Sequence, residues 1–276
     1  MKGLQLMSEY TNFFSSLRRF TIPESRFSTV FPDSCSSGCL MKTNFIDEDT
    51  NKHIYLKLSH RAKNKVWGKE SIFEVVCSRL GKQLGLPVLS YYPCLVDLQN
   101  GEPCSFGCYS YDYSSGEFVE NAQELCNRCF GLYSTSLKHL QELGFEEQLN
   151  QIMVFDYLVG NTDRHMRNIE FRQTDKEIQM VPIFDNGKSL LETFAVYPFT
   201  WDQDQMTNNF LTNGHTLRTF ECVTKPVNLY TVESLKWSDI FSQLEDYLTV
   251  EEQQMIVDFV SHQYNVLMQK GLITND

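Results

Sequence analysis

The spacing of apolar residues changes along the chain and divides it into two parts. From Phe27 to Tyr113 the apolar residues form short runs that indicate β-strands, with one clear helical stretch among them. From Asn121 onward the spacing is mainly helical and is interrupted by one hairpin. We therefore predict an α+β chain with two unequal lobes, a small, mainly β lobe at 1–112 and a larger, mainly helical lobe at 113–276.

One strand and one helix of the first lobe carry charges that can meet. In the strand Ile54–Leu58 the apolar side chains share one face, so Lys57 lies on the other. The helix predicted for Glu70–Leu84 carries Glu74 at the edge of its apolar stripe, where a carboxylate can face a cleft. A lysine held by such a carboxylate can orient nucleotide phosphates. Glu70, one turn earlier, would also fit, and two ordinary surface charges are the simpler interpretation.

Two loops of the first lobe are candidates for holding a nucleotide. Between Asp33 and Lys42 small residues predominate, and their backbone amides can cradle phosphate, with Gly38 allowing close approach. Backbone groups from Tyr109 to Tyr111 would read an adenine edge if a nucleotide lay between the lobes. A single glycine is a weak signal, and a core strand followed by a turn is the alternative for the second segment.

The second lobe is predicted to consist mainly of helices. Helical spacing covers Asn121–Leu143 and Glu147–Leu158, and a capping box at Thr249 and Glu252 begins the last helix. These helices supply a hydrophobic core, and we expect no chemistry from them.

Oxygen-bearing side chains gather between these helices and the hairpin. Asp163 and Asn168 lie on a loop, and strands at 169–171 and 180–184 would return Asp185 towards Asn168. A carboxylate at Asp163 can accept the proton of an incoming hydroxyl, while Asn168 and Asp185 offer the hard oxygen atoms that Mg²⁺ prefers. The set suits phosphoryl transfer. Its alternative is a turn rich in Asp and Asn before an ordinary hairpin.

Three further residues of this loop leave several roles open. His165 can act as a proton shuttle, contact a phosphate or brace the loop, and a neutral imidazole bonded to the backbone is the commonest arrangement. Arg164 and Arg167 can contact phosphate or brace the loop.

The composition narrows the range of partners. The 24 Lys and Arg against 35 Asp and Glu give a net charge of -11, so nucleic acid and an anionic membrane would be repelled. Met1–Glu9 lacks the apolar run of a secretory signal, and no stretch approaches the roughly 18 apolar residues of a membrane helix. We therefore expect a cytoplasmic protein without direct contact to nucleic acid or membrane.

The nine cysteines are expected to be free and mostly buried in a reducing compartment. Four of them, Cys104, Cys108, Cys126 and Cys129, have spacings that can in principle hold Zn²⁺. Cys108 lies in a strand-like run and the last two occupy expected core positions of a helix, so we do not predict a zinc site.

These motifs together resemble those of the HipA-like serine/threonine kinases. Residues 161–168 read Asn-x-Asp-x-His-x-x-Asn, like the catalytic loop of that family, and 182–185 read Pro-x-x-Asp, like its metal-binding strand end. Leu84–Val88 is similar to the end of the family's helix, and Ser37–Lys42 is similar to its phosphate loop. The resemblance covers most of the span from 34 to 190.

The resemblance implies a bilobal protein-kinase-like fold that transfers phosphate from ATP, with Mg²⁺, to serine or threonine in a protein. It implies Asp163 as the catalytic base and Asn168 and Asp185 as metal ligands. The residues that would contact the nucleotide are Ser37, Gly38, Lys42, Lys57, Glu74, Ser110, Tyr111 and His165.

The resemblance also suggests a biological setting. Many members are toxins of toxin–antitoxin pairs and autophosphorylate on a phosphate-loop serine, for which Ser34, Ser36 and Ser37 are the nearest candidates. Longer members carry an extra N-terminal subdomain, so an antitoxin or a separate protein like that subdomain is an expected partner. Because the phosphate loop has one glycine and the chain after Leu190 matches only loosely, two alternatives stay open. They are a nucleotide-binding pseudokinase that regulates a partner, and a kinase-fold enzyme with a non-protein acceptor.

Overall fold

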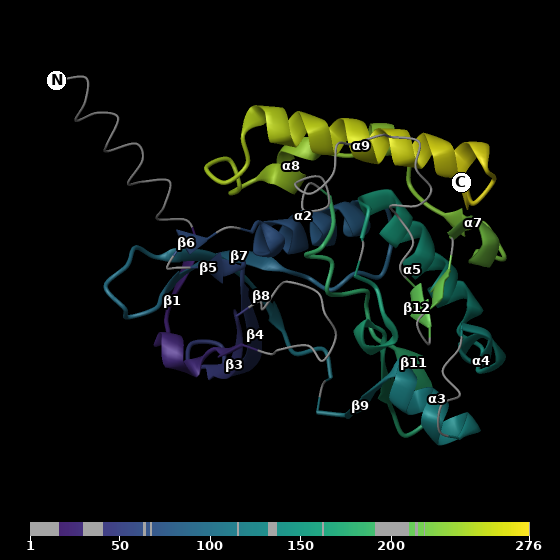
Figure 1. The fold of residues 1–276 in the computed structure, drawn as a ribbon, viewed down its shortest axis with the longest axis horizontal. Coiled ribbons are helices and arrows are strands. Elements are labelled where there is room, and N and C mark those ends of the chain that lie inside the picture. Colours follow the sequence, from purple (N-terminus) through teal and green to yellow (C-terminus); the bar gives the residue numbers. More distant parts are fainter. Residues whose placement is uncertain are drawn as a thin grey trace.

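The computed structural model describes most of the chain. The described residues are 17–29, 41–62, 65–66, 68–114, 116–131, 137–161, 163–190, 210–212, 215–217 and 219–275. Figure 1 shows a β-sheet on one side of the molecule, helices on the other, and a long C-terminal helix lying across both.

Six strands form the main sheet. In spatial order they are β1 (Arg18–Thr21), β7 (Tyr92–Asp97), β8 (Ser105–Tyr111), β4 (Lys52–Leu58), β3 (Met41–Asp47) and β2 (Ser28–Thr29). Within the described part of this sheet, only β1 and β7 pair in parallel. Arg18 of β1 contacts Asp47 of β3 at 2.5 Å, although three strands separate them in the sheet. The sheet therefore curls into an incomplete barrel.

The two faces of this sheet pack against different partners. Alternate residues of β4, such as Ile54 and Leu56, point into the barrel, where they are fully buried beside Phe20 and Val96. The opposite face packs against α2 (Glu70–Gln83), whose end is marked by Gly85 at a φ of 83°. The strand faces and the helix predicted from the apolar spacing are confirmed.

The remaining helices belong mainly to the second half of the chain. They are α3 (Ala122–Phe130), α4 (Leu137–Glu142), α5 (Glu146–Val159), α7 (Thr219–Cys222), α8 (Trp237–Phe241) and α9 (Val250–Gln269). The short 3-10 helices of the described segments are η2 (Glu24–Arg26), η3 (Met166–Asn168) and η5 (Val232–Ser234). Thr249 and Glu252 exchange both bonds of the predicted capping box at the start of α9.

Small sheets complete the architecture. One has the order β11 (Ile178–Met180), β10 (Glu170–Gln173) and β9 (Phe118–Asn121). The two-stranded sheets are β12 (Phe210–Thr212) with β13 (His215–Leu217), β14 (Val227–Asn228) with β15 (Ile273–Thr274), and β5 (Arg61–Ala62) with β6 (Lys65–Val66).

Two sequence predictions about the second lobe are wrong in detail. The single helical stretch at 121–143 is two helices, because Gly131 ends α3 at a φ of 94°, outside the helical range. The second hairpin strand ends at Met180, earlier than predicted, and Ile183 instead forms a parallel bridge with Val88. The predicted turn between the two strands is present.

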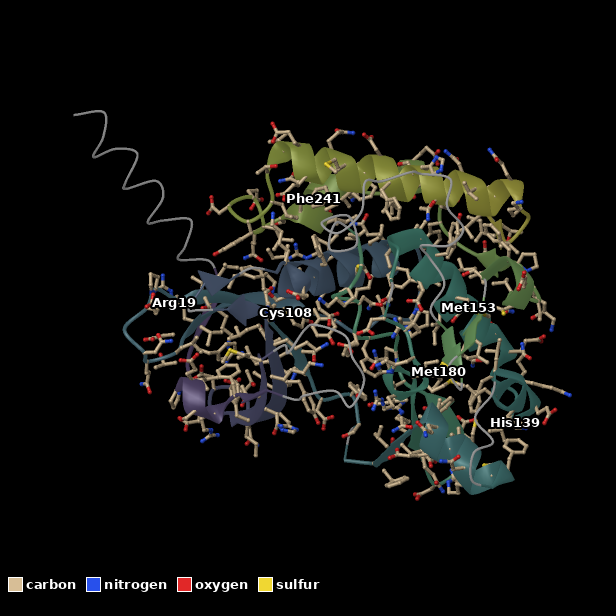
Figure 2. The ribbon with its side chains drawn as sticks, in the orientation of Figure 1. Arg19, Cys108, His139, Met153, Met180 and Phe241 are labelled. Carbon is tan, nitrogen blue, oxygen red and sulfur yellow. The ribbon has the colours of Figure 1, made fainter. Side chains whose placement is uncertain are left out.

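One hydrophobic core joins the two halves of the chain. Side chains facing α2 from the sheet, such as Cys108, and side chains of α5, such as Met153, belong to one continuous cluster (Figure 2). Arg79 of α2 donates to the carbonyl oxygens of Ile240 at 2.9 Å and Ser242 at 2.6 Å, so the C-terminal segment also holds this helix. No helix in the described residues is both long and apolar enough to cross a membrane.

Candidate active site

Lys57 lies at the centre of the candidate site. The alternation of β4 turns it towards α2, where its Nζ donates to Glu74 Oε1 at 2.5 Å and to Asp185 Oδ1 at 2.6 Å. The predicted pairing of Lys57 with Glu74 is therefore confirmed, and Asp185 joins it. Burial works to lower the pKa of Lys57, but the two carboxylates outweigh it and hold this pKa well above its usual value. The ammonium group stays charged.

Glu74, predicted at the edge of the apolar stripe of α2, is fully buried. Its Oε2 accepts the backbone N–H of Asn186 at 2.9 Å, while Oε1 accepts from Lys57. Burial raises the pKa of Glu74, and the positive charge of Lys57 opposes this only in part. A carboxylate can be buried here because both of its oxygens have donors.

Asp185 has an unusual backbone conformation for a residue with a side chain. Its φ of 59° lies in the left-handed region, and residues held there cluster at functional sites. The Nζ of Lys42 lies 3.7 Å from Asp185 Oδ1, the same oxygen that Lys57 contacts. Burial works to raise the pKa of Asp185, but Lys57 and Lys42 outweigh it and lower the pKa well below its usual value. The carboxylate is therefore ionised.

The loop after α5 holds Asp163 through its own amide side chains. Asn161 Oδ1 accepts the backbone N–H of Asp163 at 3.0 Å, and the amide nitrogen of Asn168 donates to the Asp163 carbonyl at 3.2 Å. Asp163 is half-buried, and this burial raises the pKa of its carboxyl group, opposed in part by His165. A carboxylate with a raised pKa is a better proton acceptor near neutral pH than an exposed one.

One ring nitrogen of His165, Nδ1, does not make the expected hydrogen bond to the backbone. Its Nδ1 is buried and has no hydrogen-bond partner. Burial lowers the pKa of His165, which favours the neutral imidazole. A buried polar atom without a partner, next to Asp163, fits a site in which a bound molecule supplies the missing bond.

Arg164 braces the loop and does not face outward to a phosphate. Its guanidinium donates to both carboxylate oxygens of Asp156, at 2.9 and 3.0 Å, and to Asn186 Oδ1 at 2.7 Å. Its Nη1 donates both to the carbonyl of Asn168 at 3.0 Å and to that of Phe184 at 2.6 Å. This one nitrogen atom thus links Phe184, the residue before Asp185, to Asn168. The segments that carry the two candidate metal ligands, Asn168 and Asp185, therefore lie side by side.

Sequence reasoning missed Asp156, although a signal for it exists. It is the only charged residue between Ile152 and Val159, a stretch of α5 that is otherwise apolar or aromatic. A lone carboxylate in such a stretch must be buried with a cation, and Arg164, eight residues later, is that cation.

Glu70 has a different partner from Glu74 and does not substitute for it. Its Oε1 accepts from Lys188 at 3.1 Å and its Oε2 from the backbone N–H of His60 at 3.1 Å. Both carboxylates of α2 therefore reach the segment that carries Asp185, Glu74 at Asn186 and Glu70 at Lys188.

The predicted adenine-reading segment lies within the sheet. The backbone N–H of Asp112 donates to the carbonyl of His53 at 3.0 Å, and the alternation of an antiparallel ladder then pairs the backbone groups of Ser110 with those of Tyr55. The ring of Tyr111 packs against Tyr92 and Tyr109, and Lys52 lies 4.9 Å above it. A contact from Ser110 or Tyr111 to a nucleotide stays a prediction.

Several other expectations concern residues outside this cluster. Ser37 and Gly38, with Ser34 and Ser36, lie outside the described residues. Cys104 and Cys129 are exposed whereas Cys108 and Cys126 are buried, so the expected core position of Cys129 is wrong. Among the described residues, no group of three or more His, Cys, Asp or Glu is placed to hold a metal ion.

The oxygen atoms of Asn168 and Asp185 fit Mg²⁺ rather than a softer metal. The amide nitrogen of Asn168 is used within the loop, which leaves its amide oxygen as the ligand atom, and Asp185 is ionised. Lys57 and Lys42 balance the charge of Asp185 in this structure.

Comparison with known proteins supports the fold independently of these contacts. No protein-family model matches the chain, and no curated protein matches it. Among solved structures, the proinflammatory kinase CtkA of Helicobacter pylori aligns with a TM-score of 0.58 at 14% identity, covering 92% of this chain and 97% of that one. The chain has a kinase-like fold. This confirms, at the level of the fold, the bilobal, kinase-like α+β architecture predicted from the sequence.

A second solved structure gives a weaker likeness. The HipA of Shewanella oneidensis MR-1, in complex with HipB and operator DNA, aligns with a TM-score of 0.43 at 11% identity, covering 86% of this chain and 65% of that one. This likeness is too low to carry an argument about partners.

Proposed function

We propose that the chain is an ATP-dependent phosphotransferase of the HipA-like kinase type. The observation that carries the proposal is the buried ammonium of Lys57, which lies 2.5 Å from Glu74 and 2.6 Å from Asp185. Kinases use a strand lysine, a helix glutamate and a metal-binding aspartate in this combination to hold nucleotide phosphates. The kinase-like fold supports the same assignment.

Each residue of the site has a separate task in this proposal. Lys57, oriented by Glu74, neutralises the phosphates of ATP, and Lys42 adds a second positive charge at the same place. Mg²⁺ held by Asn168 and Asp185 would supply the charge that neutralises the phosphate oxygens during transfer. Asp163 orients the acceptor hydroxyl and takes its proton. His165 supplies a hydrogen bond to a phosphate through a ring nitrogen that has no protein partner.

The acceptor is proposed to be a serine or threonine of a protein, in the cytoplasm. This rests on the resemblance of residues 161–168 and 182–185 to HipA-like kinases. The same resemblance suggests autophosphorylation in the loop that contains Ser34, Ser36 and Ser37, and an antitoxin-like protein as partner. Acceptor choice depends on surfaces outside the metal ligands, so it has to be measured.

The direct test is transfer of the γ-phosphate from labelled ATP in the presence of Mg²⁺. Wild type is expected to label itself or a protein in a cell extract, and Asp163→Asn is expected to reduce labelling at least about a hundredfold by removing the proton acceptor. Asp175→Asn, an exposed aspartate on the β10–β11 turn, is the matched control and should behave like wild type. ATP binding without any transfer would instead favour the regulatory pseudokinase, and transfer that is insensitive to Asp163→Asn would refute the assigned base.

A further inference from the structure

The incomplete barrel has a gap between β1 and β3, and Lys57 does not line it. β1 pairs only with β7, so its other edge has no described strand beside it. β2 pairs with β3 only at Met41 and Lys42, so the rest of that edge of β3 is also without a described partner. The curl of the sheet brings these two edges to face each other, as the contacts of Arg18 with Asp47 and of Phe20 with Phe45 show.

The phase of the ladder shows which backbone groups of β1 face the gap. The N–H of Ile22 donates to the carbonyl of Asp97 at 2.9 Å, which extends the parallel register of β1 with β7. In a parallel strand, alternate residues direct their N–H and C=O to opposite sides. Arg18 and Phe20 therefore bond to β7 together with Ile22, and the backbone groups of Arg19 and Thr21 point into the gap.

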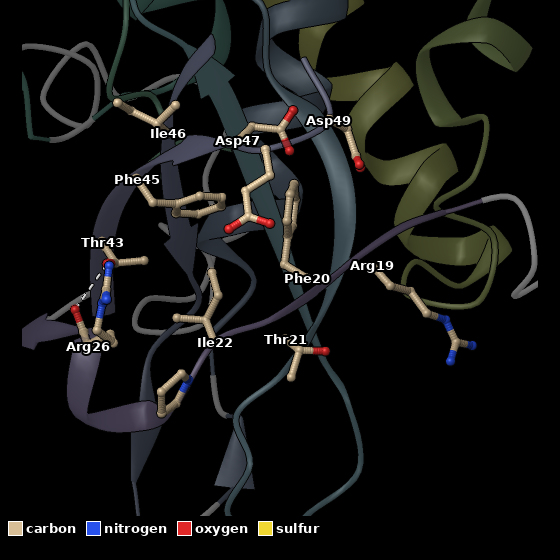
Figure 3. A pocket seen from close by; sticks show the side chains of 12 residues that line it. Arg19, Phe20, Thr21, Ile22, Arg26, Thr43, Phe45, Ile46, Asp47 and Asp49 are labelled. Atoms are coloured by element: carbon tan, nitrogen blue, oxygen red, sulfur yellow. Dashed lines mark hydrogen bonds between the residues drawn. The ribbon is translucent and has the colours of Figure 1, made fainter. Parts of the chain in front are cut away.

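A cavity of about 430 Å³ occupies this gap (Figure 3). Its lining residues from β1, η2 and β3 include the apolar side chains of Phe20, Ile22 and Phe45, among a larger number of polar residues. Ile46 stands at the cavity with 65% of its surface exposed, which is high for a large apolar side chain on a strand. The space thus offers apolar contacts and an edge of β1 with no described strand beside it, the two features that bind an added β-strand.

Charges of opposite sign mark the two ends of the gap. Arg18 pairs with Asp47 and also lies 3.5 Å from Asp49 Oδ2, so one cation faces three acidic residues, of which Glu48 and Asp49 are exposed; the side chain of Asp49 is 89% exposed. Arg26 lies at the other end of the cavity, next to Thr43, while the side chain of Arg19 points away from it (Figure 3). The gap would therefore attract a strand that carries a basic residue at the Asp49 end and an acidic residue at the Arg26 end.

We propose that this gap binds one extended segment of a second polypeptide by β-strand addition. The segment pairs antiparallel with the free edge of β1, so its N-terminal end carries an acidic residue near Arg26 and its C-terminal end a basic residue near Asp49. Apolar side chains at alternate positions fill the space beside Phe20 and Phe45. This surface is separate from the proposed phosphotransfer site and does not depend on it.

A short labelled peptide tests the proposal on the full chain. The probe is fluorescein-Glu-Val-Thr-Val-Thr-Val-Lys-amide, and its matched control has Glu and Lys exchanged. Fluorescence anisotropy should show saturable binding of the probe at concentrations up to about 1 mM, with binding of the exchanged peptide at least about tenfold weaker. Asp49→Asn should reduce this preference, whereas Asp175→Asn, equally a surface aspartate but on the β10–β11 turn, should leave it unchanged.

A pair of variants at Thr21 tests the backbone contact itself. Thr21→Pro removes the N–H that faces the gap and none that bonds to β7, and should weaken probe binding at least about tenfold. Thr21→Val keeps the N–H and should stay within about twofold of wild type, and the thermal unfolding of both variants checks that they are folded. Absence of saturable binding to wild type, or equal binding by both variants, would overturn the proposal. A third result would also overturn the proposal: no probe binding together with slow amide exchange of Arg19 and Thr21 in the free chain. In that case another segment of the same chain would fill the gap.

Discussion

Replacing Arg164 by methionine is expected to be among the most destabilising changes in this chain. Arg164 is 1% exposed and makes five hydrogen bonds, two of them to the carboxylate of Asp156. Methionine keeps much of the length of the side chain but has no donor. Asp156 would then be a buried carboxylate without a cation, and the carbonyl groups of Asn168 and Phe184 would lose their shared donor.

The magnitude follows from the cost of breaking a buried ion pair by removing one partner, about 3–5 kcal/mol. The three further acceptors that lose a bond place this change at the upper end of that range. For 276 residues the entropy of unfolding is about 0.6 kcal/mol/K, so the melting temperature should fall by roughly 5–9 °C.

The assay is thermal and urea unfolding followed by circular dichroism. Arg167→Met, an exposed arginine three residues away, is the matched control and should change stability by less than about 0.5 kcal/mol. The double variant Arg164→Met with Asp156→Leu should recover part of the loss, because it removes the unpaired carboxylate. A loss below about 1 kcal/mol for Arg164→Met, or strict additivity in the double variant, would refute the reasoning.

Three further predictions concern the surroundings of the site. Asp185→Asn should lower the free energy of unfolding at pH 6, and urea titrations should show a smaller difference from wild type at pH 3. The pKa of Asp185 is lowered in the folded chain, so its contribution to stability is complete above about pH 4 and is lost progressively as the pH falls further. Arg79→Met should cost about 2 kcal/mol and speed amide exchange in α8, since it removes the bonds to the carbonyls at the end of that helix; unchanged exchange would contradict this. Gly160→Ala should destabilise more than Gly271→Ala in thermal unfolding, because both have a left-handed φ but only the first would bring Cβ to 3.0 Å from the ring of Phe259.

Local patterns were sufficient to predict the elements that carry the site. The alternation of β4 placed Lys57 on the face opposite Leu56, and the stripe of α2 placed Glu74 near the same face. The capping box at Thr249 marked the start of α9 correctly. These features depend on residues close together in the sequence, where periodicity and capping are informative.

Features that depend on long-range contacts were beyond a local pattern. Glu74 could not be recognised as fully buried, because its second oxygen is satisfied by the backbone of Asn186, 112 residues away. The predicted hairpin was too long because Ile183 pairs with Val88 instead of continuing β11. The gap between β1 and β3 arises from the curl of the whole sheet, which no single strand encodes.

The roles of the loop residues show a third limit. For Arg164 the sequence left phosphate contact and bracing open, and its bonds to Asp156 decide for bracing. For His165 the commonest role is a hydrogen bond to the backbone, but its buried Nδ1 makes no hydrogen bond. A side chain's type restricts its chemistry, but its partners decide which chemistry is available.

The central claim is that the Lys57 site moves the terminal phosphate of a nucleotide. The most direct measurement compares transfer of label from γ-³²P-ATP and α-³²P-ATP to protein, for wild type, Lys57→Met and a Lys52→Met control. We predict that only the γ label is transferred, that Lys57→Met reduces transfer at least about a hundredfold, and that the exposed Lys52 can be replaced without effect. Transfer of the α label, or equal transfer by wild type and Lys57→Met, would contradict the account.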